Sequence, residues 1–185
     1  MKCDFYILNK NIKCIDSYKH QKEIVKLCEC LTSADMHLKY LNIFNKKNLF
    51  MSQLKEWQII LMRVGIEPSN RNFDNLTICP LHRQKLGFSY PILISCVHPN
   101  HLKESTAKLK KRFSFEHSLF FIENQDKLEY FLKLGDGLCY VCYKNAILLI
   151  ESIEPDFNDF NQLEENIPDK IDNNQSIISS GNLSK

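Results

Sequence analysis

The chain has 185 residues, 44% of them apolar and 25% charged, and a formal net charge of +2 at neutral pH. This composition is typical of a globular protein with a buried core, and the length suits one domain or two. The small net charge predicts no general attraction to nucleic acids or membranes. The apolar run at residues 5–8 is too short for a signal peptide, and no later run approaches the roughly 18–20 apolar residues that cross a bilayer. We therefore expect a soluble, intracellular protein with no membrane partner.

The first predicted region, residues 1–76, is expected to be helical from residue 18 to residue 66. Apolar residues repeat at helical spacing in three stretches, 18–31, 32–44 and 52–65. The third pattern is the clearest, because Ser52 can cap the helix and Gly65 can end it. Three short helices predict a small bundle whose surface docks a protein partner. The stripe expected to hold the bundle together contains Leu54, Trp57, Leu61 and Val64.

The second predicted region, residues 77–150, contains three close pairs of metal-ligating residues. Each pair has the separation that lets two side chains from one tight turn reach the same ion. Reduced cysteines next to histidines favour a metal over disulfides in an intracellular chain. Zn²⁺ suits this mixture of thiolate and imidazole donors, so we expect it as the cofactor. The predicted ligands are Cys79, His82, Cys96, His101, Cys139 and Cys142.

Six ligands are an awkward number, because a structural zinc ion takes four. For a single ion, the sequence favours Cys79 and His82 together with Cys139 and Cys142. This combination of C-x-x-H with C-x-x-C resembles the paired knuckles of zinc ribbons and treble clefs. The resemblance concerns the general class of zinc module and implies no particular activity.

The pair Cys96 and His101 leaves the number of ions open. These two residues would compete with another pair for a single ion, or would hold a second ion. Single cysteines are more often buried packing residues than ligands, so the four outside the pairs are expected to pack. Those four are Cys3, Cys14, Cys28 and Cys30; a second ion would draw on Cys28 and Cys30 or on His98 and His117.

No pattern of catalytic residues accompanies the pairs. The zinc-protease, deaminase, phosphate-loop and serine-nucleophile signatures are missing from the sequence. A thioredoxin-like role for Cys139 and Cys142 would need a strand before the motif and a helix beginning at its first cysteine. The preceding Gly-Asp-Gly-Leu is instead typical of a loop. We therefore expect a non-enzymatic protein without catalytic residues.

A basic segment at residues 103–112 follows His101. It contains Lys108, Lys110, Lys111 and Arg112, a pattern that fits a nuclear-import signal or a contact with nucleic-acid phosphates. A solvated loop in a lysine-rich chain is the alternative. Beyond it, the sequence predicts a helix at about 124–134, and the run at 143–150 fits either a buried strand or a helix.

Residues 151–185 form the third predicted region, an acidic tail. The tail has eight acidic and two basic residues, whereas the remaining 150 residues have 22 basic and 14 acidic ones. Low hydrophobicity with a charge of −6 predicts disorder, and the body of the chain carries +8. The expected fold is mainly α with a small β or irregular zinc-stabilised module (α+β), in which the helical bundle packs on the zinc-knuckle region.

The functional hypothesis is a nuclear, zinc-stabilised interaction module that contacts nucleic acid or chromatin-associated protein. Two alternatives stay open: a protein–protein adaptor subunit without nucleic-acid contact, and a zinc-dependent enzyme. The number of bound metal ions separates these classes, because a cross-braced ligase site would need eight ligands.

Overall fold

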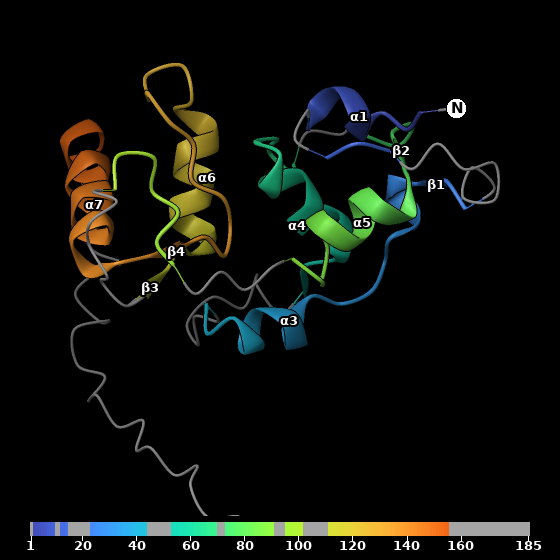
Figure 1. Cartoon of the computed structure of the whole chain (residues 1–185), viewed down its shortest axis with the longest axis horizontal. Helices are drawn as coiled ribbons and strands as arrows, with labels where there is room; N and C mark the ends of the chain where they lie inside the picture. The colour runs from blue at the N-terminus through green and yellow to red at the C-terminus, as the bar shows by residue number, and fades with distance from the viewer. Residues whose placement is uncertain are drawn as a thin grey trace, which may run out of the picture.

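The computed structural model describes residues 2–9, 12–14, 23–43, 53–69, 73–90, 95–101 and 111–155. Within these ranges the chain is helix-rich and has two small antiparallel sheets, which confirms the expected mixture of α-helix with a little β-structure (Figure 1). The elements in chain order are α1 (Phe5–Leu8), β1 (Val25–Lys26), η1 (Leu27–Glu29, a 3₁₀ turn), α3 (Asp35–Tyr40), α4 (Glu56–Arg63), β2 (Thr77–Ile78), α5 (Pro80–Leu86), β3 (Lys111–Arg112), α6 (Phe115–Glu123), β4 (Gly137–Leu138) and α7 (Tyr140–Ile153).

The elements gather in two halves (Figure 1). One half holds α1, α4, α5 and the β1–β2 sheet, and the other holds α6, α7 and the β3–β4 sheet. In each sheet the second strand leads directly into a helix, β2 into α5 and β4 into α7. The division of the chain into residues 1–76 and 77–150 stays a prediction. In space, β1 from the first region pairs with β2 from the second, Val25 opposite Ile78.

Among the residues that the structure describes, three apolar clusters form the core. One lies under α5 and includes Phe5, Leu27 and Ile78, and another lies under α7 and includes Phe113 and Phe121. The third joins residues of α3, α4, α6 and the turn before β4. Its buried members are Ala34, Leu38, Leu41, Ile43, Leu54, Ile59, Met62, Ile122 and Leu134.

Helix α4 packs against α5 in its own half and against α6 in the other half, so it is buried on several sides. Ile59 and Met62 belong to the middle cluster, whereas Ile60 and Leu61 belong to the cluster under α5. The predicted stripe therefore identified the helix correctly, but the buried surface is wider than one stripe. The helix begins at Glu56 rather than near residue 52.

Arg63 ends α4 and ties the two halves together. Its side chain is fully buried, and Nη1 donates to the carbonyl of Leu86 at 2.8 Å and to that of Gly87. Nε donates to the carbonyl of Leu134 at 3.1 Å, just before β4. Nη2 donates to Nε2 of His37 at 2.9 Å. One guanidinium thus joins the end of α5, the approach to β4 and helix α3.

Two predicted helices are wrong. Within 18–31, residues 25–29 form β1 and a 3₁₀ turn, because pairing with β2 satisfies backbone groups that a local helix would otherwise use. Within 124–134 the chain forms turns, and the helix is α6 immediately upstream, whose N-terminus is capped by Ser114 through a bond from the His117 amide at 3.3 Å. The ambiguous run at 143–150 lies within helix α7.

The predicted acidic tail begins inside this last helix. Residues 151–153 are helical as part of α7, and the predicted boundary of the acidic region at 151 stays a prediction. Residues 156–185 lie outside the described residues, and their disorder stays a prediction. Among the described helices, none has the length and apolar character needed to cross a membrane.

Candidate metal centres

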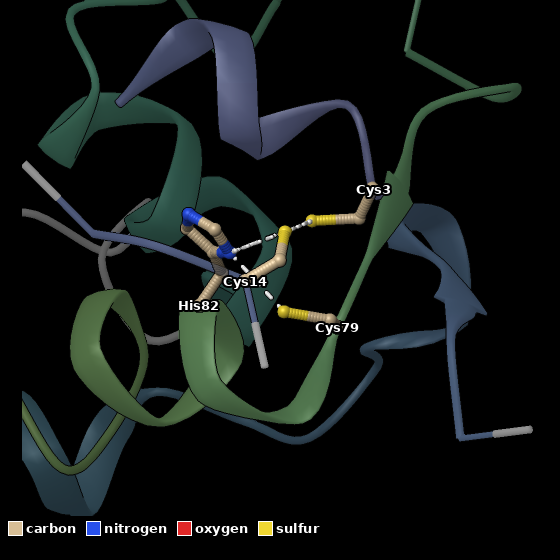
Figure 2. Close-up of side chains that lie close together, drawn as sticks. All are labelled: Cys3, Cys14, Cys79 and His82. Carbon is tan, nitrogen blue, oxygen red and sulfur yellow. Dashed lines mark hydrogen bonds between the residues drawn. The ribbon is translucent and has the colours of Figure 1, made fainter. Parts of the chain in front are cut away.

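Four ligand-type side chains meet in the half that holds α1 and α5. We call Cys3, Cys14, Cys79 and His82 site A; one ligand atom from each lies within 4.8 Å of the others (Figure 2). Nδ1 of His82 lies 3.1 Å from Sγ of Cys79, 3.4 Å from that of Cys3 and 3.8 Å from that of Cys14. The sulfurs of Cys3 and Cys14 are 3.6 Å apart. All four side chains point toward one centre.

The local fold explains how site A is assembled. Cys79 caps α5, Pro80 occupies the first helical position, and His82 follows in the first turn. Cys3 reaches the same place because Asp4 fixes the N-terminal segment against β2. One Asp4 carboxylate oxygen accepts from the amide and the hydroxyl of Thr77, both at 2.6 Å. These two hydrogen bonds also lower the pKa of Asp4.

The other half contains a second group of the same composition. We call Cys96, His101, Cys139 and Cys142 site B, and its ligand atoms also lie within 4.8 Å of one another. Nδ1 of His101 is 3.4 Å from Sγ of Cys142 and 3.6 Å from Sγ of Cys139. Cys139 caps α7 and Cys142 lies in its first turn, so the strand, cap and helix repeat the arrangement of site A.

The distances fit a tetrahedral metal ion. Zn–S bonds of about 2.3 Å and Zn–N bonds of about 2.05 Å place sulfurs about 3.8 Å apart and sulfur from nitrogen about 3.6 Å apart. The sulfur–nitrogen contacts in sites A and B, 3.1–3.8 Å, lie on both sides of the expected value, and the sulfurs of Cys3 and Cys14, 3.6 Å apart, are close to the other. All eight cysteines are free thiols, and a disulfide would need sulfurs about 2.05 Å apart. Each site therefore offers three sulfurs and one imidazole nitrogen that could hold a metal ion.

Burial makes one thiol in each site difficult to ionise without a cation. It raises the pKa of Cys3 and that of Cys142 to about 12. Burial also acts to raise the pKa of Cys139, but hydrogen bonding from the backbone and side chain of Cys142 outweighs it and the pKa is lowered. At His82, burial lowers the pKa and favours the neutral ring. A divalent cation supplies the charge that three clustered thiolates require, and neutral imidazole is the form that binds it.

The structure brings all six predicted ligands into these sites but not in the combination that the sequence favoured. Cys79 and His82 lie in site A, while Cys139 and Cys142 lie in site B, so the structure does not bring the favoured four residues together. The reason is topological: the two C-x-x-C/H pairs begin different helices and each faces its own partner segment. The signal for a second complete site was the awkward number of six ligands, two short of the eight that two ions need.

Sequence reasoning missed Cys3 and Cys14. Both were expected to pack, and both do belong to the apolar cluster under α5, but the structure also places a sulfur of each in site A. No local spacing marks them, since they are eleven residues apart and meet only through the fold. The other suggested ligands lie outside both sites. Cys30 is buried in the apolar core and Cys28 donates to the carbonyl of Asp74 at 3.6 Å.

The two extra histidines contact other residues. His98 packs against Tyr130 with ring centroids 4.5 Å apart, and its Nδ1 accepts from the amide of Asn100 at 3.1 Å. His117 contacts Ser114 through Nδ1 at 3.0 Å and lies against the ring of Phe113. Neither belongs to a group of metal-ligating side chains among the described residues.

The argument against a redox motif at Cys139 also changes. The expected loop is strand β4, and a helix does begin at the first cysteine. The local geometry therefore permits the motif. What distinguishes Cys139 and Cys142 from a redox pair is the presence of two additional donors, Cys96 and His101, within 4.8 Å.

Two of the four predicted phosphate-contacting cations make contacts inside the protein. Arg112 donates from Nη1 to the carbonyl of Gly135 at 3.0 Å, across the β3–β4 sheet. Nζ of Lys111 lies 5.2 Å from the centre of the Tyr143 ring. Lys108 and Lys110 lie outside the described residues. Comparison with protein-family models, with curated proteins and with solved structures finds no match to this chain.

Proposed function

We propose that the chain is a non-enzymatic interaction protein stabilised by two structural zinc ions, one in site A and one in site B. The observation that carries the proposal is the pair of buried or partly buried three-sulfur, one-nitrogen groups with near-tetrahedral spacing. Soft thiolates with imidazole select Zn²⁺ among the common divalent ions. Four protein donors fill the tetrahedron, whereas a catalytic zinc keeps a position for water or substrate.

The size of the regular elements explains why metal would be needed. Each strand has two residues, and isolated two-stranded sheets are marginal in water. A structural zinc contributes on the order of 10 kcal/mol to folding. Two such ions would hold the strand–helix units that the short sheets alone do not secure.

The interaction role rests on the surface and on charge. Helix α7 exposes Tyr140 (63%), Val141 (63%) and Leu148 (51%), and α3 exposes Met36 and Tyr40. Tyr140 and Leu148 lie two turns apart, and Lys144 lies on the same exposed face between them. A helix face with apolar side chains and a cation suits an interface with another protein. We propose that α3 and α7 contribute to such an interface.

Association with chromatin is the form of this role that the charge distribution favours. The body of the chain carries +8 and the segment 103–112 fits a nuclear-import signal or a phosphate contact. The internal contacts of Arg112 leave Lys103, Lys108 and Lys110 as the cations for that purpose. A protein adaptor without nucleic-acid contact is the second candidate, favoured by the exposed apolar residues of α3 and α7.

Metal content is the direct test of the zinc proposal. Elemental analysis of the purified chain should give two zinc ions per molecule, and cobalt substitution should give the absorption of tetrahedral sulfur-rich sites. The Cys28→Ser variant is the matched control, because Cys28 is a partly exposed thiol outside both sites, and it should retain both ions. A metal content of zero or one in the unaltered chain would contradict the two-site proposal.

Salt-dependent binding separates the two candidate roles. A protein that neutralises phosphates binds duplex or single-stranded nucleic acid more weakly as salt rises. The chromatin proposal expects such binding from the zinc-loaded protein, reduced when Lys103, Lys108 and Lys110 are changed together to Gln. If no binding of nucleic acid is detected at low salt, the chromatin proposal fails and the adaptor role is favoured.

A further inference from the structure

A pocket of about 330 Å³ opens on the half that contains site A, away from the metal ligands. It lies between the 3₁₀ turn after β1, the exposed side of α4 and the segment before β2. The described residues that line it are Leu27, Cys28, Trp57, Pro68, Ser69, Phe73 and Asp74. We call it the aromatic pocket.

The walls of the aromatic pocket are mainly apolar and include two aromatic rings. Trp57 and Phe73 are partly buried against the core cluster beneath them, so each ring also keeps an accessible part. Leu27 is fully buried and packs in the same cluster. Aromatic faces carry negative electrostatic potential and attract cations. Such walls suit a ligand that is apolar in shape and positive in charge.

The charged residues near the aromatic pocket also favour a positively charged ligand. Asp74 is the one charged residue among the described lining residues. Glu67 lies close by, because the hydroxyl of Ser69 donates to its Oε1. The backbone carbonyl of Asp74 already accepts from the Cys28 thiol. The pocket thus combines a negative charge with mainly apolar walls, which disfavours a strongly hydrated ammonium and suits one whose hydrogens are replaced by methyl groups.

We propose that the aromatic pocket binds the methylated ammonium group of a lysine side chain in a basic protein segment. The proposal deepens the chromatin-associated role and rests on it, since it names the chemistry of the protein partner. The methyl groups would contact Trp57 and Phe73, and the negative charge of Asp74 would favour the cation over a neutral group of the same shape.

The chain's single tryptophan makes the test direct. Trp57 fluorescence is followed while zinc-loaded protein, with its metal content verified, is titrated with Nα-acetyl-trimethyllysine amide. The same titration uses unmodified acetyl-lysine amide and the neutral isostere in which carbon replaces the charged nitrogen, all at constant ionic strength. We expect a saturable change with the trimethylated probe, and binding about tenfold weaker for each of the other two.

Variants identify the groups responsible. Phe73→Leu keeps an apolar wall and should remove most of the preference for the cation over its neutral isostere. Asp74→Asn should weaken binding of the cation a few-fold and leave the isostere unchanged. The control Asp126→Asn removes an exposed carboxylate in the other half and should have no effect.

Three results would overturn the proposal: no saturable change with the trimethylated probe, equal binding of the neutral isostere, or equal binding of unmodified lysine. Each would be obtained on protein that contains both zinc ions, and the salt-dependent binding of nucleic acid is measured separately. Failure of the aromatic pocket is therefore distinguishable from failure of the proposed function.

Discussion

Sites A and B use the same local structure but draw their remaining ligands from different distances along the chain. In both, a two-residue strand leads into a cysteine that caps a helix, and a second ligand follows in the first turn. Site B takes its other two ligands from one short segment, Cys96 and His101. Site A takes Cys3 and Cys14 from the N-terminal segment, and Cys3 is 79 residues away from His82.

The position of the histidine also differs between the two sites. It lies on the helix in site A, as His82, and in the separate segment in site B, as His101. Since both sites still offer three sulfurs and one nitrogen, the composition of the site is preserved while its order in the chain is not. The comparison teaches that the strand–cap–helix unit is the recognisable element, and that the other two ligands can come from any segment that packs against it.

The largest expected effect separates the two sites. Cys79→Ser should remove the ion from site A and Cys142→Ser the ion from site B, each leaving one zinc per chain by elemental analysis. Because a structural zinc contributes on the order of 10 kcal/mol to folding, the half that loses its ion should lose its ordered packing. Trp57 lies in the half with site A, so its emission should shift to the red in Cys79→Ser only.

A shift of equal size in both variants would show that the two halves fold as a single unit. Retention of two zinc ions by either variant would refute the ligand assignment. The Cys28→Ser variant again provides the control for metal content, with two ions expected. Asp126→Asn, which removes an exposed carboxylate in the other half, provides the control for emission, with no shift expected.

Substitution of Arg63 should have the next largest effect on stability, because its side chain contacts both halves. Arg63→Met should lower the free energy of unfolding by about 3–5 kcal/mol, since buried carbonyls of Leu86, Gly87 and Leu134 lose their donor. Urea unfolding measures this loss, with Lys127→Met as an exposed control. If Arg63→Met unfolds with the same midpoint as the unaltered protein, the proposed connection between the halves is wrong.

The contact between His37 and Arg63 predicts a smaller, pH-dependent effect. Burial, together with the charge of Arg63, lowers the pKa of His37 to about 4 from about 6.5 in the unfolded chain. Between these values the unfolded chain holds a proton that the folded chain does not, so stability falls as pH falls from about 7 toward 4. At pH 5.5 this amounts to about 1 kcal/mol relative to neutral pH.

His37→Gln keeps an acceptor for Nη2 of Arg63 and removes the titration. The loss of stability between pH 7 and pH 5.5, measured by urea unfolding, should therefore be about 1 kcal/mol smaller in this variant. The metal ligands are identical in the two proteins, so their protonation cancels in the difference. Identical pH dependence in both would exclude His37 as a contributor.

The smallest expected effect on stability concerns an ion pair in the half that contains site A. Arg83, next to His82, donates to both carboxylate oxygens of the nearly buried Glu56, from Nε at 3.1 Å and from Nη2 at 2.6 Å. The Arg83 side chain is 39% exposed, so solvent screens the pair, and Glu56→Gln should cost about 1 kcal/mol. Thermal unfolding should show this loss with both zinc ions retained; loss of the ion in site A would mean that the pair positions the metal ligands.

The features that the sequence predicted correctly are the local ones. The pairs from Cys79 to His82 and from Cys139 to Cys142 were visible because their spacing is itself the geometry of a helix beginning. Helix α4 was visible because apolar residues repeat at helical spacing between Leu54 and Val64, although the residues that the fold buries are wider than that stripe. Cys3 and Cys14 were not, since hydrogen bonds between Asp4 and Thr77, rather than any local pattern, bring the N-terminal segment to β2.

The wrong helices have the same explanation. Val25 and Lys26 lie in a stretch with helical periodicity, but the backbone pairs with Ile78 and Thr77, a contact that a single local window does not contain. The helix placed at 124–134 was displaced because its apolar residues serve two different clusters, Leu132 under α7 and Leu134 between the halves.

Site A combines residues that are far apart in the sequence, and this separation has a consequence for synthesis on the ribosome. Translation adds about 5–20 residues per second, so the 79 residues between Cys3 and His82 take about 4–16 s to make. During that interval Cys3 and Cys14 have been made without the residues that complete their site. In site B, His101 and Cys142 are separated by 41 residues, so the corresponding interval is about half as long. Among the thiols of the two sites, Cys3 and Cys14 are therefore the ones exposed longest to oxidants and to competing metals before the fold closes over them.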